Sequence, residues 1–134
     1  MADSLRLRRN DQNEYLVQIR VAGCSVDALI DTGMTSPDCL IAVGLDSENF
    51  TEAATSLRGF RRTEMDGVGY EATRLVVVGL GRVSIEGLDG SEIDTYVAEV
   101  GDNLLGVCYF QRLAGFEVVW DLDTGQMTIT KKPQ

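Results

Sequence analysis

Alternating residue types near the start of the chain predict a β-hairpin. Between residues 15 and 21 every second residue is β-branched or aromatic, and Ala22-Gly23 then interrupt the pattern, as in two short strands joined by a tight turn. The second arm ends in the apolar run Ala28-Leu29-Ile30, which is typical of a strand buried on both faces. We therefore expect two antiparallel strands within residues 14–31, with Asp31 at the end of the second.

Two other stretches have the spacing of a helix. Within residues 46–59 the apolar positions follow i, i+3, i+4 and i+7: Phe50, Ala53, Ala54 and Leu57. Asp46 or Ser47 can cap the start of this short amphipathic helix, and Gly59 can end it. A second short helix is expected from about residue 105 to residue 113, since Gly115 follows it.

The remaining segments predict strands. An exposed hairpin is expected over residues 60–75, with its tip near 66–69, and apolar strands follow within 73–87 and 92–100. The last segment, 116–130, predicts a closing hairpin in which one face carries four apolar residues: Trp120, Leu122, Met127 and Ile129. These patterns predict a mostly β, single domain over residues 1–134 with one or two short helices.

Glycines in "VVVGLGRVS" at residues 76–84 resemble a dinucleotide-binding turn only superficially. Gly79 and Gly81 follow an apolar strand, but Ser84 stands where a third glycine belongs, and the next residues alternate like a strand. No helix start is expected there to receive a pyrophosphate, so we do not expect a dinucleotide site.

Charge and composition narrow the function. The net charge is −9, from 12 basic and 21 acidic residues, so nucleic acid and anionic membranes are poor candidate partners. The chain has no histidine, which excludes Ser-His-Asp and Cys-His hydrolases and removes the commonest ligand of catalytic zinc. We expect no metal and no cofactor, and acid–base chemistry must use carboxylates, lysine, tyrosine or cysteine.

The lack of a recognisable signal peptide and the pattern of cysteines favour a cytoplasmic protein. The first residues lack the apolar core of a signal peptide, and no 18 apolar residues run together. Cys24, Cys39 and Cys108 are odd in number and lack C-x-x-C spacing. We therefore expect three free thiols, mainly buried as small apolar side chains, in a reducing compartment.

The tripeptide Asp-Thr-Gly occurs twice, at residues 31–33 and 123–125. The second copy lies between two strands of the closing hairpin, where Asp and Gly are ordinary turn residues. The first follows a buried type of strand and precedes further apolar residues. A carboxylate that enters an interior is costly unless it is paired or hydrogen-bonded, so the position of Asp31 calls for a structural or functional reason.

The segment "VAGCSVDALIDTGMTS" at residues 21–36 resembles the hairpin and active-site turn of retropepsin-like (clan AA) aspartic proteases. "NLLG" at 103–106 resembles their second signature, two apolar residues and a glycine behind the catalytic turn. The hairpin at 60–75 stands where that family has its flap. The resemblance covers about residues 14–130 and is greatest to the small single-domain microbial members. The N-terminal residues and the last few residues lie outside it, and we expect them to be flexible.

The resemblance implies a retropepsin-like closed β-barrel with the acid-protease fold, in which a half-length chain supplies one acid and two chains pair. Asp31 of each subunit would share a proton and activate water, because two carboxylates about 3 Å apart cannot both ionise. The residues expected to support Asp31 are Thr32, Gly33, Thr35, Leu104, Leu105 and Gly106. Flap residues expected to contact substrate are Asp66, Gly67, Val68 and Gly69, although an ordinary exposed hairpin explains them as well.

Thr32 would hydrogen-bond across the two-fold axis, and Gly33 would let backbone N–H groups point at the carboxylates. Met34 stands where retropepsins usually have alanine or this microbial group an aromatic residue, and Ser36 replaces a frequent glycine. Neither departure removes an acid or a hydroxyl. Both bear on the shape of the neighbouring pocket and hence on substrate specificity.

The sequence thus predicts a hydrolase: a homodimeric aspartic-type endopeptidase that acts on a peptide or protein substrate in proteolysis. An alternative is a non-catalytic dimerisation or peptide-binding module that retains the fold, because a fold does not guarantee chemistry. A third possibility is a monomeric β-barrel that binds a small ligand.

Overall fold

The computed structural model describes residues 4–7, 9–68 and 71–133, with only the backbone described for 66–68 and 71–73. The strands are β1 (Ser4–Leu7), β2 (Leu16–Val21), β3 (Cys24–Asp31), β4 (Ile41–Leu45), β5 (Arg58–Val68), β6 (Glu71–Ile85), β7 (Ile93–Glu99), β8 (Leu104–Gly106), β9 (Phe116–Asp121) and β10 (Gln126–Lys131). The helices are α1 (Ser47–Ala54), α2 (Val107–Arg112) and the 3₁₀ turn η1 (Pro37–Cys39). No helix in the described ranges is long and apolar enough to cross a membrane.

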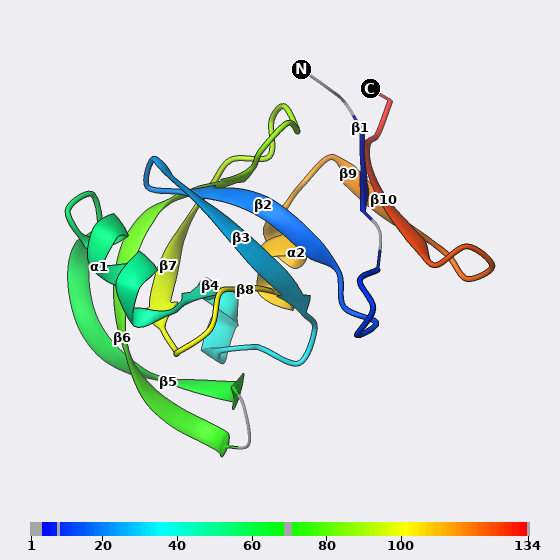
Figure 1. Cartoon of the computed structure of the whole chain (residues 1–134). Helices are drawn as coiled ribbons and strands as arrows, with labels where there is room; N and C mark the ends of the chain where they lie inside the picture. The colour runs from blue at the N-terminus through cyan, green and yellow to red at the C-terminus, as the bar shows by residue number, and fades with distance from the viewer. Residues whose placement is uncertain (1–3, 8, 69–70, 134) are drawn as a thin grey trace.

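Most strands form one sheet that closes on itself (Figure 1). The strand order is β2-β3-β8-β4-β7-β6-β5, and an extra pairing of β2 with β6 makes the first six of these strands a barrel. β3 pairs with β8 in parallel, and β4 pairs with β7 in parallel, whereas the other neighbours are antiparallel. β5 pairs with β6 alone and extends from the barrel as one arm of a hairpin.

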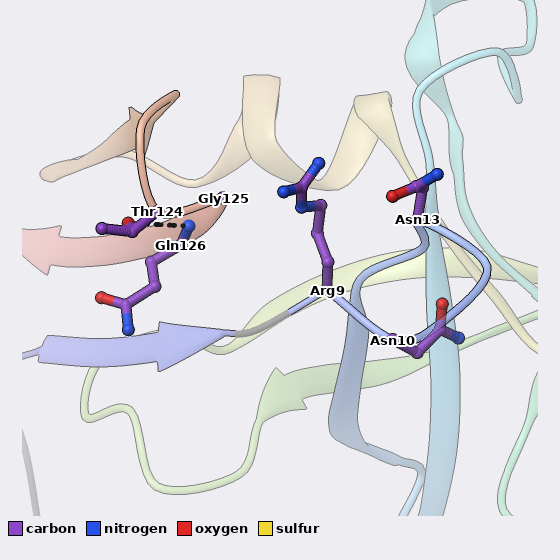
Figure 2. Close-up of a pocket in the computed structure, with 6 residues that line it drawn as sticks. All are labelled: Arg9, Asn10, Asn13, Thr124, Gly125 and Gln126. Atoms are coloured by element: carbon purple, nitrogen blue, oxygen red, sulfur yellow. Dashed lines mark hydrogen bonds between the residues drawn. The ribbon is translucent and has the colours of Figure 1, made fainter.

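A second sheet stands beside the barrel, in the order β1-β10-β9. The first and last described strands, β1 and β10, both belong to this sheet (Figure 1), and Leu7 of β1 pairs with Met127 of β10. The sequence pattern did not predict β1, because four residues are too few to show a period. After β1, residues 9–13 turn back beside the β9–β10 turn, and the two segments line a polar hollow (Figure 2).

The barrel interior is filled by one large core. β2 alternates between exposed and buried residues as its sequence pattern predicts, so that Val17, Ile19 and Val21 point inward. All five residues of β4 are buried, and α2 adds the buried Tyr109. Apart from Ile41 and Gly44 of β4, these residues belong to one connected apolar cluster, which places the main stabilising burial inside the barrel.

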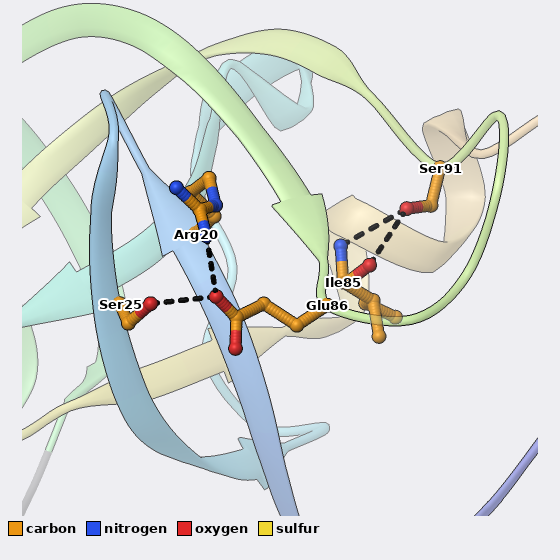
Figure 3. A network of polar contacts seen from close by, with 5 residues as sticks. All are labelled: Arg20, Ser25, Ile85, Glu86 and Ser91. Atoms are coloured by element: carbon orange, nitrogen blue, oxygen red, sulfur yellow. Dashed lines mark hydrogen bonds and ion pairs between the residues drawn. The ribbon is translucent and has the colours of Figure 1, made fainter. Parts of the chain in front are cut away.

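Polar contacts connect β6 to the first hairpin (Figure 3). Glu86, directly after β6, accepts hydrogen bonds from Arg20 Nη2 at 3.0 Å and Ser25 Oγ at 2.6 Å. The buried Ser91 hydroxyl accepts the Ile85 N–H at 3.0 Å. Arg20 is exposed, so its ion pair adds little stability, whereas Ser91 satisfies backbone groups that the barrel would otherwise leave unpaired.

The structure confirms the predicted hairpins but shortens both helices. The turn at Ala22-Gly23 joins β2 to β3, and Asp46 rather than Ser47 caps α1, accepting the Asn49 N–H at 2.8 Å. α1 ends at Ala54, so Leu57 lies outside it and Gly59 lies in β5. Residues 104–106, predicted partly as helix, form β8 before α2 begins. β4 was not predicted, because a five-residue apolar run has no period to identify it.

Gly79 and Gly81 lie within strand β6, not in a nucleotide-binding turn. Added side chains at these positions would collide with Leu57 and Phe60. The glycines therefore allow the segment after α1 to pack closely on β6.

The prediction of three free thiols is wrong. Cys39 and Cys108 form a disulfide with a Cα–Cα distance of 5.1 Å, and Cys24 is free. Their separation of 69 residues hid the pairing, because the pairing of β8 with both β3 and β4 brings the two segments together. With this disulfide formed, the cysteines no longer indicate a reducing compartment, and the cytoplasmic location stays a prediction.

Candidate active site

Asp31 is the last residue of β3 and is half-buried. The Gly33 N–H donates a hydrogen bond to Asp31 Oδ1 at 2.9 Å, and the Met34 N–H donates to the Asp31 carbonyl at 3.3 Å. A Cβ at residue 33 would stand 3.3 Å from Asp31 Oδ1, so glycine lets the turn close against the carboxylate. The arrangement fixes one carboxylate oxygen by a backbone donor, which is the contact expected of Gly33.

Strand β8 supports the turn from behind. It pairs with β3 in parallel, so that Leu104 lies opposite Leu29 and Gly106 lies opposite Asp31. The three residues of β8 are buried, and the Leu29 N–H donates to the Asn103 carbonyl at 2.9 Å. The structure therefore brings together the two sequence segments that carry the predicted site.

Met34 lies below the turn and is fully buried. It belongs to a second apolar cluster with residues of β4, β5, β6 and β7, among them Ile41, Met65 and Val78. A Cβ on Gly106 would come within 2.6 Å of Met34 Cε. The unusual methionine thus packs under the turn, and the glycine of "NLLG" leaves room for it.

Ser36, the other departure from the family pattern, is also buried. Its hydroxyl accepts the Ile41 N–H at 3.0 Å, which connects the end of the turn to the start of β4. A glycine could not make this contact, so the serine has a structural reason to be present.

Two threonines flank the acid in different surroundings. Thr32 is exposed, and its predicted partner belongs to a second chain, so that contact stays a prediction. Thr35 is half-buried, and its hydroxyl lies 3.7 Å from the Cys108 sulfur. Thr35, which was predicted to support Asp31, therefore contacts the disulfide directly.

An apolar groove of about 200 Å³ begins at the turn. Its lining comes from the end of β3, from α2 and from the β9–β10 hairpin: Ile30, Thr32, Val107, Phe110, Val118, Trp120 and Met127. Val118 is 45% exposed and Trp120 is 53% exposed. Leu122, predicted to share this face, lies beyond β9 and is exposed. Exposed apolar side chains gathered in one place mark an interaction surface.

The predicted flap is the hairpin of β5 and β6. Asp66 pairs with Thr73 and Val68 with Glu71, and Gly67 lies between them in β5. Gly69 lies outside the described residues. Nearer the barrel, Arg61 lies over the Tyr96 ring at 4.7 Å from its centroid, a cation–π contact that fixes the base of β5.

A small hollow separates the base of β5 from the segment after the acid turn. Its lining includes Ser36, Asp38 and Leu40 on one side and Arg61 and Glu64 on the other. The β5 arm of the hairpin therefore lies beside the segment that follows Asp31. A flap that closes over substrate needs this position next to the candidate site. Its substrate contacts stay a prediction.

The second Asp-Thr-Gly is an ordinary turn. Asp121 Oδ1 accepts the N–H groups of Asp123 and Thr124 at 3.0 and 3.3 Å, and Gly125 has φ +71°. The backbone N–H groups of Thr124 and Asp123 lower the pKa of the Asp121 carboxyl. Asp123 itself is exposed and supplies only its backbone, which agrees with the assignment of this copy to a turn.

The polar hollow beside this turn has a volume of about 480 Å³ (Figure 2). Its lining residues are Arg9, Asn10, Asn13, Thr124, Gly125 and Gln126, none of which carries a carboxylate. General acid–base chemistry by paired acids therefore cannot occur there, although the hollow is larger than the groove at Asp31. Among the described residues, no three Cys, Asp or Glu side chains are grouped to hold a metal ion.

Tyr109 anchors α2 beneath the site. Its hydroxyl donates to the Ser91 carbonyl at 2.6 Å, and its side chain is fully buried. Burial raises the pKa of Tyr109 to about 12, an effect that hydrogen bonds with Ser91 and Ile85 partly oppose. The residue is a neutral structural donor at physiological pH.

No protein-family model matches the sequence, and no curated protein matches it. The structure is similar to the crystal structure of a retropepsin-like aspartic protease from Rickettsia conorii, with a TM-score of 0.61 and 18% sequence identity. The match covers 96% of this chain and 90% of that chain. This chain has a retropepsin-like fold. The similarity confirms the fold predicted from the two sequence signatures.

Within the retropepsin-like fold, several residues that shape the site were not predicted. Asn103 Oδ1 accepts the Asp46 N–H at 2.9 Å, and its amide donates to Asp46 Oδ2 at 3.2 Å. Asn103 belongs to the recognised "NLLG" segment, but its hydrogen-bond partner Asp46 lies 57 residues away, so the sequence did not predict their contact. The Cys39–Cys108 disulfide and the groove around Trp120 were missed for the same reason, since each joins segments distant in sequence.

Proposed function

We propose that this protein is a homodimeric aspartic endopeptidase in which two Asp31 carboxylates, one from each subunit, activate water. The observation that carries the proposal is the half-buried Asp31, held by the Gly33 N–H in a turn backed by β8. The likeness to an aspartic protease supports it at the level of fold.

The chemistry follows from two acids that share a proton. The ionised carboxylate accepts a proton from water as the water attacks the peptide carbonyl, while the protonated carboxyl hydrogen-bonds to the carbonyl oxygen. The Gly33 N–H donates to one carboxylate oxygen and so orients the acid. No group other than carboxylates is needed, which suits a chain that lacks histidine.

One chain cannot supply the pair. The second Asp-Thr-Gly belongs to the β9–β10 turn, where its carboxylate is exposed and plays no part in the turn's hydrogen bonds. Two copies of Asp31 can meet only across a two-fold axis, and the surface next to Asp31 must then lie in the interface. The apolar groove that starts at Thr32 is that surface.

A peptide-library digest tests the activity, with Asp123→Asn as a matched control. We expect wild-type protein and Asp123→Asn to cleave peptides between acidic and neutral pH, and Asp31→Asn to lose cleavage, because an amide cannot share the proton. Cleavage by Asp31→Asn at the wild-type rate would exclude this mechanism. A folded wild-type dimer that cleaves nothing would favour the non-catalytic module.

Val118→Lys and Val119→Lys together test the interface. Val118 lines the groove, whereas its exposed neighbour Val119 points to the other face of β9. A buried, unpaired lysine is costly, so Val118→Lys should shift sedimentation velocity towards monomer and lower specific activity, while Val119→Lys should change neither. Equal behaviour of the two variants would place the interface elsewhere.

A further inference from the structure

The Cys39–Cys108 disulfide closes a covalent ring behind the Asp31 turn. Cys39 lies eight residues after Asp31, at the end of η1, and Cys108 lies in α2, two residues after Gly106. Gly106 of β8 pairs with Asp31 of β3. The disulfide therefore joins the segment that follows β3 to the helix α2 that follows β8. The bond therefore fixes the path of residues 32–39 relative to β8 and α2.

The tethered segment has a constrained backbone. Asp38 and Cys39 both have positive φ, +57° and +51°. Aspartate adopts this conformation more often than most side chains, whereas cysteine seldom does. Such residues persist where the surrounding structure holds them, and they occur often near functional sites. Hydrogen bonds also hold the segment: the Cys39 N–H donates to Ser36, the Leu40 N–H to Pro37 and the Ile41 N–H to Ser36 Oγ. The Leu40 carbonyl accepts the Tyr96 N–H and the Thr95 hydroxyl of β7.

Contact with the site is direct. The Thr35 hydroxyl lies 3.7 Å from the Cys108 sulfur, and Thr35 is one of the residues that the family resemblance predicts to support Asp31. The two sulfurs also differ in access, since Cys39 is half-buried whereas Cys108 is fully buried. An external thiol can therefore reach Cys39 first.

We propose that Cys39–Cys108 is a redox-sensitive tether, which a dithiol reductant opens and which holds the Asp31 turn in its active geometry. The proposal rests on the function proposed above and assigns its regulation. A reductant thiolate attacks Cys39 Sγ, the S–S bond breaks, and Cys108 leaves as a thiolate that takes up a proton. The reductant's second thiol then attacks the mixed disulfide, which frees Cys39 as a thiol and leaves the reductant as its own disulfide.

The reduced state has a place for the new thiol. Cys39 Sγ lies 3.1 Å from the Gln111 side-chain oxygen, a contact that becomes a hydrogen bond only when the sulfur carries a proton. With the covalent bond gone, residues 35–40 are held by the hydrogen bonds named above. The positive φ values can then relax, and Thr35 loses its fixed distance from Cys108.

The test compares oxidised and dithiothreitol-reduced protein by peptide cleavage and by hydrogen exchange at residues 35–41. Reduction should speed exchange of these amides and lower kcat/KM by about 10- to 100-fold, since small displacements of reacting groups have effects of that size. Cys39→Ser and Cys108→Ser should match the reduced protein with or without dithiothreitol. Cys24→Ser, which removes the free thiol, should respond like wild type.

Each failure has a separate meaning. Unchanged exchange and cleavage after verified reduction would overturn the tether, as would Cys39 and Cys108 thiols that air oxidation leaves fully alkylatable. If oxidised protein cleaves no peptide, the proposed function fails, yet faster exchange on reduction would still support the tether itself.

Discussion

At the scale of single residues, the acid turn depends on what lies beneath it. Met34 is fully buried under the turn, and Gly106 provides the space for its methyl group. Asp31 is oriented by a backbone donor from Gly33. Residues that never touch a substrate therefore decide where the carboxylate points, because interiors pack closely and shifts are transmitted.

Gly106→Ala should destabilise the fold by about 1–3 kcal/mol, the usual cost of overpacking. The added Cβ would lie 2.6 Å from Met34 Cε and 3.1 Å from the Met34 carbonyl oxygen. Shortening the side chain with Met34→Ala removes the first clash but not the second, so the cost of Gly106→Ala should fall in that background without vanishing. Urea denaturation of the four proteins gives the coupling, and strict additivity would contradict the contact.

Tyr109 should make stability fall at high pH. Its pKa is raised from 10.0 to about 12 in the folded protein, so its contribution is complete below pH 10 and is lost as pH rises through about 12. The shift corresponds to roughly 2–3 kcal/mol. Denaturation midpoints measured across this range should fall less steeply for Tyr109→Phe, and parallel curves would show that Tyr109 does not titrate as described.

At the scale of elements, α1 is attached to the strand behind the candidate active site. Asp46 caps α1 through the Asn49 N–H, and it also exchanges two hydrogen bonds with Asn103 at the start of β8. Asn103 in turn accepts the Leu29 N–H of β3. One aspartate thus connects a helix start to the two strands that carry the acid turn.

Asp46→Ala should cost about 1–2 kcal/mol, the upper half of the range for lost caps, because Asn103 also loses a partner. Ser47→Ala is the matched control, since Ser47 is the neighbouring residue that the sequence also allowed as the cap. Its change should stay within about 0.5 kcal/mol. Thermal or urea denaturation measures both, and equal losses would mean that Asp46 is not the cap.

At the scale of the whole molecule, charge opposes the assembly that the proposed mechanism needs. Each chain carries a net charge of −9, so two chains repel each other as they approach. Burial of the apolar groove beside Asp31 would favour the proposed association. Salt does not weaken this hydrophobic stabilisation. The balance between these two effects should therefore depend on ionic strength.

Added salt should tighten the dimer. Screening shortens the reach of the repulsion to about 8–10 Å near physiological ionic strength. At matched, limiting protein concentrations, the dimer fraction from sedimentation velocity and the specific activity of peptide cleavage should rise together over a salt series. A species that stays monomeric and fully active throughout would contradict a site shared between two chains.

Local sequence predicted much of the fold and part of the site. The β2–β3 hairpin, the closing hairpin and Asp31 at a strand end follow from periods and turn residues within a few positions of each other. β1 and β4 were missed because they are short, and both helices were predicted too long because packing, rather than propensity, sets helix ends.

The sequence by itself determined which Asp-Thr-Gly could be catalytic, because strand patterns on either side distinguish a buried turn from a hairpin tip. Only the tertiary structure decided what surrounds Asp31. The parallel pairing of β3 with β8 brings Gly106 beside Asp31 and lets Cys39 meet Cys108 across 69 residues. Such contacts depend on three-dimensional distance between segments far apart in the chain, and local periodicity carries no information about that distance.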